Sequence, residues 1–149
     1  MNFKEQLYQR CVDYVKQRSA TIENTIQWHR KSLSSETKSS AGDKHETGRA
    51  MLQLEMEKAA QQLENIQLMR ETLAKIDVAK ITSVASLGAI IETNLGAYFL
   101  SISLGQLKVG NETFFAISAS SPIGKLLLGK KSGDIFVWNG KKIEIHQVS

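Results

Sequence analysis

Two carboxylates, Asp43 and Glu46, have the residue type and the spacing that could support chemistry in this chain. Three residues apart on a helix, they share one face, with Cβ atoms about 5–6 Å apart. Such a pair offers hard oxygen ligands for a Mg²⁺ ion that keeps several waters and binds substrate phosphates. The same spacing is similar to a capping box, which satisfies free amides at a helix start and needs no further function. Spacing alone leaves both interpretations open.

Basic residues surround this pair in the sequence. Five cations lie near it, against Glu36 and the two carboxylates themselves: Arg30, Lys31, Lys38, Lys44 and Arg49. A partner that carries phosphates therefore fits electrostatically, although an ordinary solvated helix face would carry similar charges. The net charge of the whole chain, +4, is too small to argue for autonomous binding of duplex nucleic acid.

Other chemically capable residues form no recognisable site. Residues 124–131 superficially resemble a phosphate-binding loop, but Lys131 stands where Ser or Thr would hold Mg²⁺. Cys11 has no helix N-terminus or clear cationic partner to activate it, so we expect an inert position on the helix surface or at a seam edge. His29 and His146 lack partners at metal-ligand spacing, which makes a zinc site improbable.

The length and composition bound the class of protein. The chain has 149 residues, of which 42% are apolar and 23% charged, which suits one medium domain or two small ones and excludes wholesale disorder. A single cysteine excludes an internal disulfide and a cysteine-based zinc site. No apolar run approaches the roughly 18 residues of a membrane span. We therefore expect a cytoplasmic chain that contacts no membrane.

Two heptad seams predict a helical hairpin. From Phe3 to Leu33 there is no Gly or Pro, and mostly apolar residues alternate at spacings of four and three: Tyr8, Val12, Val15, Ser19, Ile22, Ile26, His29 and Leu33. The second seam has the same alternation: Leu52, Met56, Ala59, Leu63, Ile66, Arg70 and Leu73. A polar, Ser-rich segment separates them, so the helices should fold back as an antiparallel coiled coil. Helices of about 30 residues give an arm roughly 45 Å long.

The remainder of the chain predicts a small sheet. Strand patterns occupy residues 88–92, 97–104, 113–118, 134–138 and 141–146, and Asn139-Gly140 joins the last two as a hairpin. Ser121-Pro122 predicts an N-cap and first helical position, and Gly129 ends that short helix. The predicted class is α+β: a coiled-coil hairpin over 1–79, with its tip loop near 34–46, then a small antiparallel sheet with one short helix over 80–149.

The segment that begins at Ser121 resembles the C-terminal signature of the Gre family of bacterial transcript cleavage factors. Ser121-Pro122-Ile123 is followed by Leu127-Leu128-Gly129 and then by Gly133-Asp134 before a strand, with the spacing of that family. Gly42-Asp43 with Glu46 is similar to the tip of its coiled coil. The order of the family, a hairpin and then a small FKBP-like domain, covers nearly the whole chain.

This resemblance implies an accessory factor of RNA polymerase, not an enzyme in its own right. The FKBP-like domain would dock at the polymerase's secondary channel through Ser121, Pro122, Ile123, Gly129, Gly133 and Asp134. The hairpin would reach the 3′ end of the transcript RNA, where Lys38, Lys44 and Arg49 would face phosphates. Asp43 and Glu46 would act in trans, sharing a Mg²⁺ only in the complex, to stimulate cleavage of backtracked transcripts. The chain would need no cofactor of its own, and we expect a monomer.

The tip departs from the family pattern, which leaves alternatives open. Where the family has Asn, a second Glu and Tyr, this chain has Thr47-Gly48-Arg49-Ala50, which lacks that carboxylate and ring and adds a cation. A regulator of the same fold that occupies the channel without stimulating cleavage is one alternative. A prolyl isomerase or chaperone-like module is another, although an FKBP-like fold does not by itself imply isomerase activity. A third is a structural coiled coil that dimerises through its seam.

Overall fold

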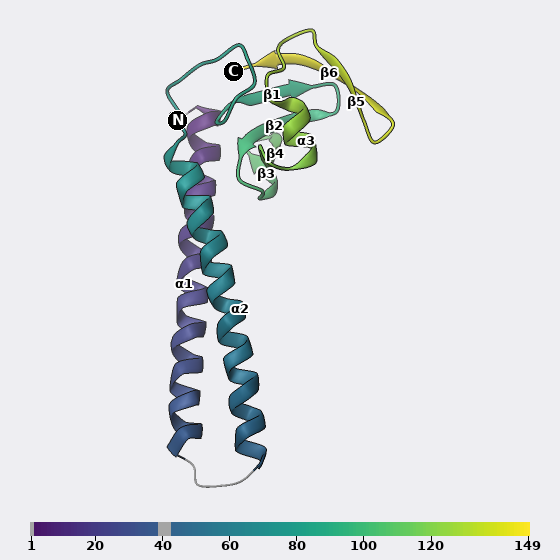
Figure 1. The fold of residues 1–149 in the computed structure, drawn as a ribbon. Helices are drawn as coiled ribbons and strands as arrows, with labels where there is room; N and C mark the ends of the chain where they lie inside the picture. Colours follow the sequence, from purple (N-terminus) through teal and green to yellow (C-terminus); the bar gives the residue numbers. More distant parts are fainter. Residues whose placement is uncertain (1, 39–42) are drawn as a thin grey trace. The chain divides into compact units, whose positions relative to one another are not determined.

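The computed structural model describes residues 2–38 and 43–149, with the side chains of residues 2–35 and 47–149. Its elements, labelled in Figure 1, are α1 (Phe3–Lys38), α2 (Asp43–Ala74), β1 (Ile90–Thr93), β2 (Gly96–Ser101), β3 (Gly105–Val109), β4 (Glu112–Ser118), α3 (Pro122–Leu127), β5 (Ile135–Trp138) and β6 (Lys141–Val148). The chain forms two compact units. Met1–Val12 and Glu71–Ser149 make the β unit, and Asp13–Arg70 make the helical unit.

The helical unit consists of the outer parts of α1 and α2, which run antiparallel and side by side (Figure 1). Among the predicted seam residues, Val15 and Ile22 in α1 and Ala59 and Ile66 in α2 are buried. Other apolar seam positions, such as Leu63, are partly buried. The Arg70 guanidinium reaches across from α2 to α1 and donates a hydrogen bond of 2.8 Å to the Ser19 hydroxyl. The coiled-coil-like hairpin that the heptad spacing predicts is therefore confirmed.

The β unit contains a six-stranded sheet with the strand order β3-β4-β2-β1-β6-β5. Four of its five pairings are antiparallel, and β2 and β4 pair in parallel. The parallel pair arises because β3 and β4 form a hairpin that returns the chain to the direction of β2, beside which β4 then lies. The predicted α+β class is confirmed, with this parallel pair as the difference from a purely antiparallel sheet.

Strand β3 is the element that the sequence pattern missed. The alternation over residues 97–104 predicted one strand, but β2 ends at Ser101 and β3 begins at Gly105. Only two residues of β3, Leu107 and Val109, are apolar, and both are buried. A period-two signal over so few residues is weak, and a glycine at the strand start masks it further.

Each face of the sheet is partly covered within the β unit. On one face, Leu127 of α3 joins the core cluster with Ile91, Leu100 and Ile145. On the other face lie the first turns of α1, which we call the root of α1 (Phe3–Val12). There the Phe3 and Phe114 ring centroids are 5.5 Å apart. This root anchors the start of a long helix in the sheet.

Cys11 corrects one prediction from the sequence. Its side chain is completely buried in the root, with its Sγ 3.8 Å from the Ser101 Oγ of β2, and does not lie on the helix surface or at a seam edge. The reason is that the root has the sheet as a second neighbour, so residues spaced four apart beside the seam are buried as well. Leu7, four residues earlier, is buried in the same way.

Candidate functional site

The tip carboxylates lie at the beginning of α2. The helix starts at Asp43, so Asp43 and Glu46 both belong to its first turn. Their side chains, like those of Lys38 and Lys44, lie outside the described part of the structure, and their predicted roles stay predictions. Arg49, the third predicted phosphate-facing cation, is described and exposed on α2.

The segment from Ser121 folds as a capped turn of helix. The Ser121 hydroxyl accepts a hydrogen bond from the Gly124 amide at 3.1 Å and donates one of 2.6 Å to the Ser118 carbonyl oxygen. Pro122 occupies the first turn, where its missing amide costs nothing. A Cβ at Gly124 would overlap the Ser118 carbonyl oxygen, so the turn needs glycine there. The predicted N-cap is confirmed in its geometry.

The end of α3 and the following loop attach to the rest of the sheet through backbone hydrogen bonds. The Gly129 amide donates to the Ala85 carbonyl at 2.8 Å, and the Gly133 amide donates to the Ile145 carbonyl at 2.8 Å. Asp134 closes the turn before β5, because its carboxylate accepts a hydrogen bond of 2.9 Å from the Lys131 amide. These three signature residues thus have internal structural partners.

The six predicted docking residues therefore divide into two kinds. Ser121, Gly129, Gly133 and Asp134 hold the loop and α3 in place through hydrogen bonds, and Ile123 packs beside the core cluster. Pro122 is exposed, as is Leu128 at the end of α3, which the spacing had not singled out as a contact. The exposed apolar side chains of this segment are accordingly those of Pro122 and Leu128.

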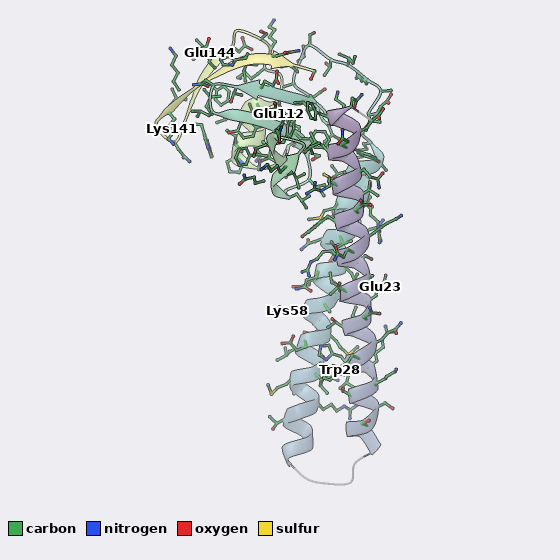
Figure 2. All side chains as sticks on the ribbon, turned by 180° about the vertical axis from the view of Figure 1, so that it is seen from behind. Glu23, Trp28, Lys58, Glu112, Lys141 and Glu144 are labelled. Carbon is green, nitrogen blue, oxygen red and sulfur yellow. The ribbon has the colours of Figure 1, made fainter. Side chains whose placement is uncertain are left out.

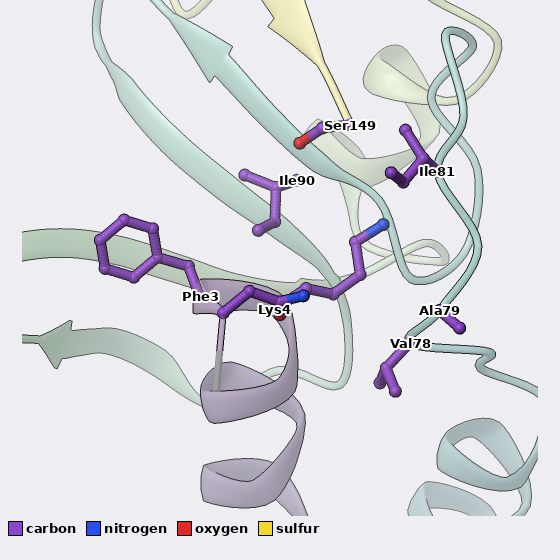
Figure 3. A pocket seen from close by; sticks show the side chains of 8 residues that line it. Phe3, Lys4, Val78, Ala79, Ile81, Ile90 and Ser149 are labelled. Atoms are coloured by element: carbon purple, nitrogen blue, oxygen red, sulfur yellow. The ribbon is translucent and has the colours of Figure 1, made fainter.

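A cavity at the root was not predicted from the sequence (Figure 3). It holds about 280 Å³ and is lined mostly by apolar groups and by Lys4: Asn2, Phe3, Lys4, Val78, Ala79, Ile81, Ile90 and Ser149. The Lys4 side chain is only 7% exposed, and its Nζ donates a hydrogen bond of 2.8 Å to the Lys80 carbonyl oxygen. Desolvation lowers the Lys4 pKa, and the Asp77 carboxylate opposes that effect more weakly. The hydrogen bond to the Lys80 carbonyl offsets part of the cost of burying this cation.

The Cys11 thiol, which lies in this root, is in an environment that disfavours reactivity. Burial raises its pKa, while the hydrogen bond with Ser101 and the charge of Arg10 counteract this effect less strongly. Because the thiolate is the reactive form, a buried thiol with a raised pKa is a poor nucleophile. The sequence signal for this environment was the four-residue spacing of Phe3, Leu7 and Cys11, a second stripe beside the seam.

The helical unit carries a hollow on α1. It is lined by Thr21, Asn24, Thr25, Trp28 and His29, and Trp28 is 63% exposed (Figure 2). The Trp28 and His29 rings meet edge to face, with centroids 5.2 Å apart. His29 is buried at the seam, as its heptad position predicted, and its Nδ1 has no hydrogen-bond partner among the described residues. The other histidine, His146, is exposed on β6.

Neither a metal cluster nor a membrane helix is found in the described ranges. No three His, Cys, Asp or Glu side chains there are grouped to hold a metal ion. No helix of the described chain combines the length and the apolar character of a membrane crossing. The sequence matches no protein-family model and no curated protein.

Proposed function

We propose that this chain is a Gre-like regulator of transcription elongation that binds RNA polymerase and inserts its helical hairpin into the secondary channel. In this proposal the β unit, which we take as FKBP-like, docks through the surface around Pro122. The tip carboxylates Asp43 and Glu46 stimulate cleavage of backtracked transcripts. The chain acts as an accessory factor, and the polymerase performs the hydrolysis.

The observation that carries this proposal is the combination of a long hairpin with a sheet that presents the Ser121-Pro122 turn. The two helices have 36 and 32 residues, which correspond to about 54 Å and 48 Å at 1.5 Å per residue. Helices of this length allow a tip to act at a distance from the anchored root of α1. The capped, exposed Pro122 gives the β unit a preformed contact surface.

The chemistry at the tip divides the proposal into two versions. In the first version, Asp43 and Glu46 share a Mg²⁺ with the polymerase. When bound, this ion would supply Lewis-acid activation of the attacking water. In the second, the chain occupies the channel without stimulating cleavage. One residue after the tip supports the second version. Arg49 is an exposed cation at the position where the family carries a carboxylate.

The test adds the chain to polymerase complexes that have been stalled by backtracking and measures shortened transcripts on a gel. We expect cleavage with the wild type and its loss in Asp43→Ala and Glu46→Ala. Glu55→Ala, which removes an exposed carboxylate farther along α2, is the matched control and should cleave normally. Cleavage that persists in both tip variants would remove the carboxylate role. Slower elongation without cleavage would establish the inhibitory version.

A second measurement tests docking separately from chemistry. Pro122→Asp should weaken binding to core polymerase by about tenfold or more, because it places a charge at the centre of the contact surface. Leu95→Asp changes another exposed apolar residue, in the turn between β1 and β2, and should bind normally. Binding that neither variant weakens would contradict this surface. Failure of the wild type to bind polymerase, together with turnover of an X-Pro peptide, would replace the proposal by a prolyl isomerase.

A further inference from the structure

The sheet has two edge strands, β3 and β5, and they are protected unequally. At the β3 edge, the Arg10 Nη1 in the root of α1 donates a hydrogen bond of 3.0 Å to the Lys108 carbonyl oxygen. That bond satisfies one of the outward-facing groups of β3. An edge strand without such cover presents a row of free amides and carbonyls, to which another strand can pair.

Strand β5 has free backbone amides and carbonyls, and its register with β6 shows which residues carry them. The hairpin turn at Asn139 (φ 51°) and Gly140 (φ 74°) joins Trp138 to Lys141, so that these two residues form the closing hydrogen-bonded pair. Hydrogen-bonded pairs alternate along an antiparallel ladder, so Phe136 also faces β6. The bond of 2.9 Å from the Ile145 amide to the Asp134 carbonyl fits the same alternation.

The amides and carbonyls of Ile135 and Val137 must then point away from the sheet. Among the described residues, no other segment is hydrogen-bonded to these four groups. The side chains of the same two residues are also open, with Ile135 52% and Val137 66% exposed. Two adjacent outward positions of one edge strand therefore combine free backbone groups with exposed β-branched side chains.

These two side chains lie on the sheet face that the root of α1 covers elsewhere. Phe136 points to the opposite face, where it packs beside the α3 core cluster, so Ile135 and Val137 share the face of Phe114 and Ser101. The root contacts that face at Phe114 of β4 and Ser101 of β2. At the β5 end, Ile135 and Val137 lie exposed on this face beside the charged side chains of Glu144 and Lys142 in β6.

The charges around β5 indicate the kind of segment that would fit. Four lysines lie in β6 and in the loop before β5, against the carboxylates of Asp134 and Glu144: Lys130, Lys131, Lys141 and Lys142. Lys142 pairs directly across from Val137, and Figure 2 shows Lys141 and Glu144 at this end of the sheet. A second copy of the chain would bring like-charged groups together at this edge, whereas an acidic segment would complement them.

We propose that the β5 edge binds an extended, acidic segment of another protein as an added strand. Its backbone pairs with the free groups of Ile135 and Val137, its apolar side chains cover those two residues, and its carboxylates face the lysines. This mode of recognition obtains affinity from main-chain hydrogen bonds and specificity from alternate side chains. This binding does not depend on the proposed function, because it uses the β5 edge and not the surface around Pro122.

The experiment titrates the full chain with an acetylated peptide of seven residues in which Glu and Val alternate, and follows backbone amide NMR signals. We expect the largest shifts at Ile135 and Val137, and slower hydrogen exchange of these two amides in the complex. Val137→Lys should weaken binding by about tenfold or more, because a charged side chain guards the edge without removing its backbone groups. Raising salt from about 0.05 M to about 0.5 M should weaken binding as well.

A control variant and a control peptide test whether binding depends on the β5 edge and on charge. Leu95→Lys alters another exposed apolar residue, at a turn away from β5, and should bind like the wild type. A peptide of alternating Lys and Val should not bind. Absence of binding by the acidic peptide up to roughly millimolar concentration would overturn the proposal. So would shifts that map away from β5, or a dimer in sedimentation that Val137→Lys dissociates, since the occupant would then be a second copy.

Discussion

The root of α1 and the part of α1 in the helical unit belong to one continuous helix but differ in how many neighbours bury them. In the root, Leu7 and Cys11 are completely buried because they pack against the sheet beside the predicted seam. Beyond Val12, burial is confined to single seam positions such as Val15 and Ile22. A helix with one partner buries one narrow stripe, whereas a helix that also meets a sheet buries a wider face.

The two regions also differ in which residue types they bury. The seam of the helical unit includes three small or polar residues, Ser19, Ala59 and His29. The Arg70 guanidinium donates a hydrogen bond to the Ser19 hydroxyl. These groups bury little apolar surface and so contribute little free energy of transfer. We infer that the root and the sheet hold most of the stability, and that the outer hairpin opens more easily.

The largest expected effect separates the root from the outer hairpin. Leu7→Ala removes a completely buried side chain between α1 and the sheet, and should lower the free energy of unfolding of the β unit by about 2–5 kcal/mol. Urea denaturation followed by the fluorescence of Trp138, in a Trp28→Phe background, measures this change. Cys11 is the only thiol of the chain, so its labelling rate reports the opening of the root. It should rise in parallel.

A smaller effect is expected in the outer hairpin. Ile22→Ala removes an apolar side chain from a seam with one helix as partner, and should cost about 2 kcal/mol, at the low end for such a change. Loss of helical circular dichroism at low urea should precede any change at Trp138. The rate of Cys11 labelling should stay that of the wild type. Equal acceleration of labelling by Leu7→Ala and Ile22→Ala would show that the two regions unfold together, against the comparison.

Sequence patterns captured the long elements well, for physical reasons that are visible in particular residues. Heptad spacing identifies a seam because every helix turn repeats it, and Ser121-Pro122 identifies a cap because the local hydrogen bonds need only neighbouring residues. Asn139-Gly140 identified the last hairpin because that turn requires positive φ at both positions. Each of these signals is local.

What the sequence could not supply is set by contacts between distant residues. The burial of Cys11 depends on Ser101, ninety residues away, and the parallel pairing of β2 with β4 depends on where a hairpin folds back. The buried Lys4 depends on the Lys80 carbonyl. At the tip, the spacing of Asp43 and Glu46 gives a hypothesis about chemistry, and the polymerase assay decides between that role and helix capping.

The smallest expected effect concerns Lys4, the one buried cation of the root. Desolvation lowers its pKa in the folded state below the ordinary value of 10.5, so the charged form carries a penalty in the fold. Below the folded-state pKa, Lys4 is protonated in both states and the penalty is fully present. Between the folded-state pKa and about 10.5 the folded state loses its proton first, so the contribution of Lys4 to stability rises with pH in that window.

Lys4→Met should therefore change the pH profile more than the stability at neutral pH. At pH 7 we expect a free energy of unfolding within about 1 kcal/mol of the wild type, because removal of the buried charge offsets loss of the hydrogen bond to Lys80. As pH rises into the alkaline window, the wild type should gain on the variant. Lys108→Met replaces an exposed lysine in β3 and is the control. If the profiles of wild type and Lys4→Met stay parallel throughout, the buried-charge account of the root is wrong.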